Sequence, residues 1–184
     1  MADTKISAMT AATTPLTGAE LVPLVQSGVN VQTTISTIST FTRGYGSIYV
    51  AGGSTVQTTS GTANTYTQVA AFTTNGVAAG GVTPVAASDK LTLAAGVYSI
   101  TFNASFTASN NHTFLFRCFN STAGTAFVNT VGKNHTQSTD PHQVGFSAII
   151  SVASTSDVIV QVASTDTSQS FTITDANFIA LAIG

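Results

Sequence analysis

Residues 97–106, VYSITFNASF, alternate strictly between apolar and polar side chains, and this restricts the chain to folds built on half-buried β-strands. Successive side chains of a strand point to opposite faces, so one face of this segment must enter a core. The apolar positions are Tyr98, Ile100, Phe102, Ala104 and Phe106. The other face carries Ser99, Thr101, Asn103 and Ser105, so the sequence predicts a strand with one face outside the core.

Further short segments rich in β-branched and aromatic residues are separated by turn residues. They cover 47–51, 65–73, 90–93, 113–119, 126–131, 143–152, 157–163 and 171–183, the last with a break near Asp175. No segment has a convincing helical period. The pattern therefore predicts an all-β domain of about eight to ten strands, arranged as a sandwich, jelly roll or barrel.

The sequence divides into an arm, residues 1–44, and a head, residues 45–184. Around Pro23 the arm has small apolar clusters that predict a short strand or turn. Ile35, Ile38 and Phe41 are spaced by three, which weakly favours one helical turn, although their β-branched neighbours oppose it. The arm has too little apolar area to fold alone, so we expect it to be extended and ordered by a partner.

Charge is scarce: 7% of residues are charged, the formal net charge is -2, and Lys and Arg number 5. A nucleic-acid partner is not expected, because such surfaces need clustered basic residues. A membrane span is not expected either, because a span needs about 20 consecutive apolar residues. No signal peptide is evident, and the lone Cys118 excludes an intrachain disulfide, which agrees with assembly in a reducing cytoplasm.

The sequence predicts no enzyme and no cofactor. Ser, His and Asp all occur, but without a nucleophile-elbow motif. His135 and His142 share a polar loop with Asp140, but the spacing matches no standard metal-ligand motif, so we predict no metal. Cys118 shares a face with apolar neighbours and is predicted to be a buried thiol. Arg117 falls on the opposite face, which we expect to be solvated. The alternative is that Arg117 forms an intersubunit salt bridge.

The last strand, residues 178–183, is apolar at odd and even positions alike. One face can enter the domain's own core, while the other needs a second layer, for which a neighbouring subunit is the natural candidate. The alternative is that the strand is simply central in a thick sandwich. The residues predicted for the subunit interface are Ile149, Phe178, Ile179, Leu181 and Ile183.

The head resembles the globular heads of complement-type and tumour-necrosis-factor-like trimers. The resemblance is carried in order by 96–102 (GVYSITF), 145–150 (GFSAII), 156–162 (SDVIVQV) and the terminal 178–184 (FIALAIG). It implies a jelly roll of about ten strands that packs into a homotrimer. The acidic calcium clusters of some family members are not evident, so no metal is carried over.

The arm resembles the N-terminal segment of many tailed-bacteriophage virion proteins. There, Lys-Ile-Ser-x-Leu-Thr leads into Leu-x-Gly-x-Glu-Leu-x-Pro-x-Val-Gln, and here 5–10 read KISAMT and 16–26 read LTGAELVPLVQ, with Met9 in place of Leu. The resemblance implies a virion component on the outer surface of the particle, assembled in the host cytoplasm.

Together these observations lead us to expect a capsid decoration, or cement, protein that binds the major capsid protein as a trimer. The arm residues predicted to contact the capsid are Ile6, Leu16, Leu21, Leu24, Val25, Ile35 and Ile38. The alternative is a short tail fibre or receptor-binding tip, whose arm enters the tail and whose loops bind host surface polysaccharide. A secreted cytokine-like ligand is disfavoured by the missing signal peptide.

Overall fold

The computed structural model describes residues 21–26, 29–34, 44–109, 111–136 and 140–183. The chain divides into two compact units, Met1–Thr42 and Arg43–Gly184, whereas the sequence prediction places the boundary after residue 44.

In the N-terminal unit, β1 (Leu21–Gln26) and β2 (Val29–Thr34) form an antiparallel hairpin. The segment around Pro23 is thus a strand, and its proline is tolerated because both strands of a two-stranded hairpin are edges. Ile6, Leu16, Ile35 and Ile38 lie outside the described residues, as does most of the helical turn considered for 33–42. Their proposed contacts therefore stay predictions.

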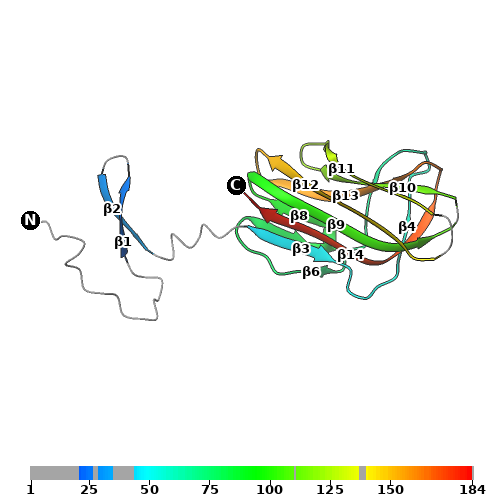
Figure 1. The fold of residues 1–184 in the computed structure, drawn as a ribbon, viewed down its shortest axis with the longest axis horizontal. Helices are drawn as coiled ribbons and strands as arrows, with labels where there is room; N and C mark the ends of the chain where they lie inside the picture. Colours follow the sequence, from blue (N-terminus) through cyan, green and yellow to red (C-terminus); the bar gives the residue numbers. More distant parts are fainter. Residues whose placement is uncertain (1–20, 27–28, 35–43, 110, 137–139, 184) are drawn as a thin grey trace, which may run out of the picture. The chain divides into compact units, whose positions relative to one another are not determined.

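The head is an all-β jelly-roll sandwich of two antiparallel sheets, as the sequence predicts (Figure 1). The β13 sheet has the order β11-β10-β13-β8-β7, with β5 also beside β13. Its strands are β5 (Thr67–Gln68), β7 (Val82–Val85), β8 (Lys90–Leu93), β10 (Thr113–Asn120), β11 (Thr125–His135) and β13 (Ser156–Ser164). A single 3-10 turn, Ala86–Ser88, joins β7 to β8.

The β14 sheet has the order β12-β9-β14-β3-β6, with β4 also beside β14. Its strands are β3 (Tyr45–Tyr49), β4 (Thr55–Thr58), β6 (Thr74–Asn75), β9 (Gly96–Ala108), β12 (His142–Val152) and β14 (Ser170–Ala182). The long strands β9 and β14 lie side by side along the head (Figure 1).

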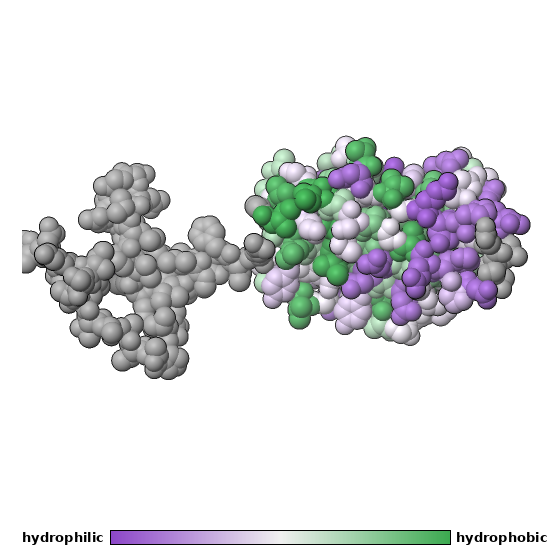
Figure 2. Space-filling model, viewed as in Figure 1, coloured by the Kyte–Doolittle hydropathy of each residue, from purple (hydrophilic) through white to green (hydrophobic). Residues whose placement is uncertain are grey.

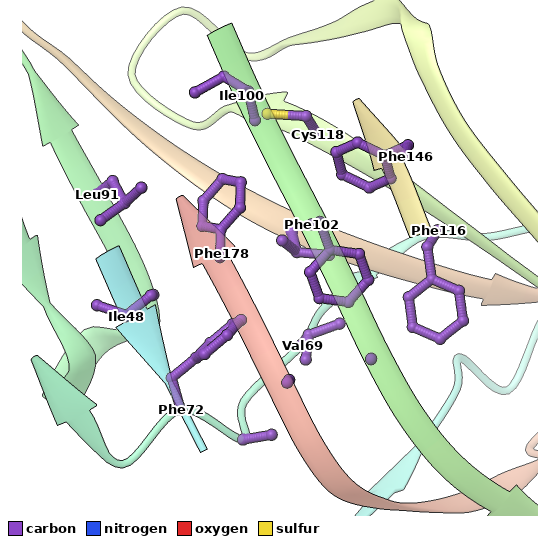
Figure 3. Packing of buried hydrophobic residues seen from close by; sticks show 14 of the residues in the cluster. Ile48, Val69, Phe72, Leu91, Ile100, Phe102, Phe116, Cys118, Phe146 and Phe178 are labelled. Atoms are coloured by element: carbon purple, nitrogen blue, oxygen red, sulfur yellow. The ribbon is translucent and has the colours of Figure 1, made fainter. Parts of the chain in front are cut away.

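The core lies between the sheets and is rich in phenylalanine. The predicted alternation of β9 is confirmed, since its apolar positions from Tyr98 to Phe106 are buried. Phe102 stacks on Phe116 of the opposite sheet, with ring centroids 5.7 Å apart. Figure 3 shows Phe102, Phe116, Phe178 and Cys118 among the buried side chains that fill this layer.

Two short regions differ from the sequence prediction. The expected strand over 65–73 is reduced to β5, with β6 starting just beyond it. Strand β7 has no counterpart among the predicted strands, and its Pro84 fits because β7 is the last strand of its sheet. The predicted break near Asp175 is a shift in the β9–β14 register between Ile173 and Asp175.

Asparagine side chains tie the two sheets together where the edge strands β11 and β12 run beside each other. Asn129 Nδ2 donates to the carbonyl oxygen of Ile149 at 3.1 Å, and Asn134 Nδ2 donates to that of Gln143 at 2.9 Å. These bonds occupy carbonyl groups that an edge strand otherwise offers to a foreign strand. They also fix which residues of β11 and β12 lie at the same level.

Candidate self-association surface

Strand β14 buries one set of side chains and turns the other set outward. Phe178 and Ala180 are 0% exposed, whereas Ile179, Leu181 and, just past the strand, Ile183 alternate with them and face away from the core. The prediction that Phe178 lies in the subunit interface is wrong, because its side chain is fully enclosed in the core of its own subunit. Ile149, the predicted interface residue on β12 of the same sheet, also faces outward.

The cross-strand register brings these outward residues together. Ile149 lies opposite Ser99, Ser99 opposite Leu181, and Leu181 opposite Tyr45. We call the resulting cluster the apolar end; it consists of Tyr45, Val97, Ile149, Ile179, Leu181 and Ile183. Ile149 is 61% exposed, Ile183 42%, Tyr45 40% and Leu181 39%. In Figure 2, hydrophobic residues gather at the end of the head where the chain finishes.

Further along the same face the surface becomes polar and forms an open groove of about 640 Å³. We call this part the polar end; its outward side chains are Tyr49, Asn103, Ser105, Gln143, Asp175 and Asn177. Gly145 keeps the groove open, because a Cβ at this position would come within 2.5 Å of Asn103 Oδ1. The side chains of the polar end have no hydrogen-bond partner among the described residues, so their donors and acceptors remain available.

On the outer face of the β13 sheet, by contrast, the charged side chains around Asp157 bind one another. Lys90 Nζ lies 2.7 Å from Asp157 Oδ2, and Thr92 donates to the same carboxylate at 2.6 Å. The Lys90 hydrogen bond, followed by that of Thr92, lowers the pKa of Asp157. These polar groups are satisfied within the subunit.

Arg117, on the same outer face, is also held within the subunit. Its Nε donates to Gln161 Oε1 at 2.9 Å, and its guanidinium carbon lies 3.7 Å from the centroid of the Tyr66 ring. The alternative of an intersubunit salt bridge through Arg117 therefore has no support in this geometry.

The histidines and the cysteine have ordinary structural surroundings. His112 Nδ1 lies 2.9 Å from Asp166, and His135 Nδ1 lies 2.9 Å from the Thr113 hydroxyl. The described residues contain no group of three or more His, Cys, Asp or Glu able to hold a metal. Cys118 is buried, as predicted, and burial raises the pKa of its thiol. In the parts of the chain that are described, no helix is long and apolar enough to cross a membrane.

The head is similar in fold to many solved structures. The globular domain of zebrafish complement 1qA protein matches with a TM-score of 0.51 and 13% identity, over 77% of this chain and 98% of that one. The Eiger TNF of S. frugiperda matches with a TM-score of 0.52 and 9% identity, over 77% and 94%. Murine APRIL matches with a TM-score of 0.52 and 8% identity, over 77% and 99%.

No family model matches the chain, and no curated protein matches it. At these identities the likeness to solved structures concerns the fold, and in this respect it agrees with the resemblance seen in the strand patterns.

Sequence reasoning found most of the apolar end but missed two of its members and the whole polar end. Tyr45 begins a short strand whose position beside β14 has no local signal, and Val97 is the first outward residue of β9. The polar end brings together residues from four strands, and only the register places them side by side. Their one sequence signal is the unusual concentration of amides on outward positions.

Proposed function

We propose that the head assembles into a homotrimer through the outer face of the β14 sheet. The observation that carries this proposal is the apolar end, where isoleucine, leucine and tyrosine side chains adjoin on one exposed sheet face. Contiguous apolar patches of this kind mark interaction sites. Covering a fully exposed leucine or isoleucine side chain contributes about 2 kcal/mol, and the partly exposed members of the apolar end contribute in proportion to their exposed area.

The number of copies is inferred from the family that the head resembles, whose members are trimers. The fold match with complement 1qA and tumour-necrosis-factor proteins supports the use of that family as a guide. A closed ring also satisfies every copy equally, which an open chain of copies does not.

We further propose that the trimer is a capsid decoration protein. The arm sequence supports a virion role, since it follows the N-terminal pattern of tailed-phage virion proteins over residues 5–26. Three arms would spread over neighbouring capsid subunits, and their small apolar side chains together with strand addition would hold them there. Because the three arms are joined, weak single contacts become strong together and stabilise the lattice.

The decisive experiment adds the purified full-length protein to phage heads that lack it and images the particles. We expect hundreds of copies, grouped in threes, over the outer capsid surface, and greater resistance of the heads to heating. Binding of a few tens of copies at the tail would instead support a fibre or receptor-binding tip. No binding to either part would contradict a virion role.

Leu24→Asp is the matched arm variant for this experiment, with Leu181→Asp as the head variant. A charged residue in the arm should abolish binding to the capsid while leaving the trimer intact. The head variant should leave single arms whose binding is weak. Equal capsid binding by the wild type and both variants would contradict the proposal that the arm binds the capsid and the head forms the trimer.

A further inference from the structure

We infer that Lys133 of one copy pairs with Asp175 of the next copy and thereby sets the register of the trimer. The inference rests on the proposed trimer and specifies which surfaces meet in it. One surface is the polar end of the β14 sheet, and the other is the sandwich edge formed by β11 and β12.

Among the residues of the head that the structure describes, Lys133 and Asp175 are the charged side chains without a partner in their own subunit. Of the lysines and arginines that the structure describes, Lys133 has no carboxylate, hydrogen-bonding or aromatic partner, and it is exposed. Asp175 in turn has no partner among the described residues. Each other described carboxylate has an interaction within the subunit: Asp89, Asp140, Asp157 and Asp166.

These two residues cannot meet within one copy, because they lie on opposite outer faces of the sandwich. Lys133 is paired with Leu115, which alternates with the buried Phe114 and Phe116 and so faces out from the β13 sheet. Asp175 is paired with Ser105 and faces out from the β14 sheet. Two sheets packed face to face are about 10 Å apart, and the side chains point away from one another.

Lys133 and Asp175 lie at the same position along the strand direction, which we call their level. Two residues that pair between copies around a ring must share this level. Asn134 bonds to β12 at Gln143, Gln143 lies opposite Ser105, and Ser105 lies opposite Asp175. Lys133, next to Asn134, is therefore at the level of Asp175. In a ring whose axis runs parallel to the strands, rotation preserves these levels, so the lysine at the edge of one copy reaches the aspartate on the face of the next.

The apolar parts of the two surfaces match in the same way. Asn129 bonds to β12 at Ile149, which shares its level with Leu181. Val128, 91% exposed at the edge, is next to Asn129. An edge-to-face contact at this level places Val128 and Ile149 of one copy on the apolar end of the next. Apolar residues thus meet apolar residues where the lysine meets the aspartate.

The test reverses each charge in the full-length protein and measures trimer dissociation by sedimentation equilibrium. Lys133→Asp and Asp175→Lys should each weaken the trimer about tenfold or more, because like charges then face each other in three interfaces. The double variant should recover wild-type affinity to within about threefold, since opposite charges are again opposed. Thr83→Lys, on the outer face of the β13 sheet, controls for added charge.

A cross-link provides a second measurement that does not depend on affinity. The variant combining Lys133→Cys with Asp175→Cys should form disulfide-linked dimers and trimers on mild oxidation, while each single variant should not. Cys118 is buried and does not interfere. If the wild type is a trimer but the charge-reversal variants bind as tightly and the double-cysteine variant does not cross-link, the inference is overturned and the proposed trimer is not. A monomeric wild-type protein would overturn both.

Discussion

The two outer faces of the head are built from the same kind of strand yet differ in how their polar groups are satisfied. On the β13 sheet, Lys90, Asp157 and Arg117 are bound by neighbours in the same subunit. On the β14 sheet, Asp175 and Asn103 have no side-chain partner among the described residues, and Leu181 is exposed at the other end of the same face. The central strands of the β13 sheet, whose polar groups are satisfied internally, need only water, whereas an unsatisfied face with exposed leucine and isoleucine fits a second protein surface.

The difference between the two faces is significant because charged residues are scarce in this protein. With only 7% charged residues, solubility depends on hydroxyl and amide groups, and a single unpaired aspartate or lysine stands out against that background. The same scarcity lets one complementary pair determine the register of an interface, because few competing pairings exist.

The strongest test of the contrast places a charge on each face. Leu181→Asp should dissociate the trimer, because each of the three interfaces loses about 1 kcal/mol of apolar burial and must cover a carboxylate. Thr83→Asp adds the same charge to the β13 sheet and should leave the trimer intact. Size-exclusion chromatography with light scattering at several concentrations measures both. Equal effects of the two variants would remove the distinction between the faces.

Adjacent residues of β14 give a finer test, because Phe178 and Ile179 point to opposite sides. Phe178→Ala should lower the free energy of unfolding by about 3–5 kcal/mol, since it leaves a cavity in the core. Ile179→Ala should weaken association and change the stability of the isolated subunit little. Urea unfolding at one fixed protein concentration, together with sedimentation, separates the two effects. If Ile179→Ala destabilises the subunit as much as Phe178→Ala does, the assignment of Ile179 to the interface is wrong.

The internally satisfied face should show its own pH dependence. The pKa of Asp157 is lowered in the folded protein, so its stabilising effect is present above the ordinary aspartate pKa and is lost as pH falls through the folded pKa. Asp157→Asn should therefore cost about 1 kcal/mol at pH 7, and the difference from wild type should close below about pH 4. Urea unfolding across this range measures it. In a Lys90→Met background the same substitution should lower the free energy of unfolding much less. A loss of stability that does not change with pH would contradict the stabilising role assigned to the Asp157 carboxylate.

Cys118 is expected to produce the smallest effect. Its burial raises the thiol pKa, so little thiolate forms at neutral pH and a thiol reagent should react only as the protein unfolds. The rate of modification with and without urea measures this. Rapid labelling of the native protein would show that the core around β10 opens easily.

The strand pattern of the head could be predicted because alternation is a local property. The alternation from Tyr98 to Phe106 and the two-sided character of 178–183 follow directly from the chain. The strands β7, β4 and β6 were missed because short edge strands with proline or mostly polar residues carry little local signal.

The site was only partly predictable, because a strand known to be apolar on both sides does not reveal which side faces the core. Phe178 and Ile179 could be told apart only once the shift after Ile173 and the pairing with β9 were fixed. The polar end depends on the register of four strands, which no local pattern specifies.

The most direct test of the account is the mass of the full-length protein in solution. Sedimentation equilibrium over a wide concentration range should give three times the chain mass of 18.7 kDa, with Leu181→Asp falling to the single-chain value. A wild-type protein that stays at 18.7 kDa at the highest concentrations would show that the exposed face of the β14 sheet needs no second copy, and would contradict the central claim.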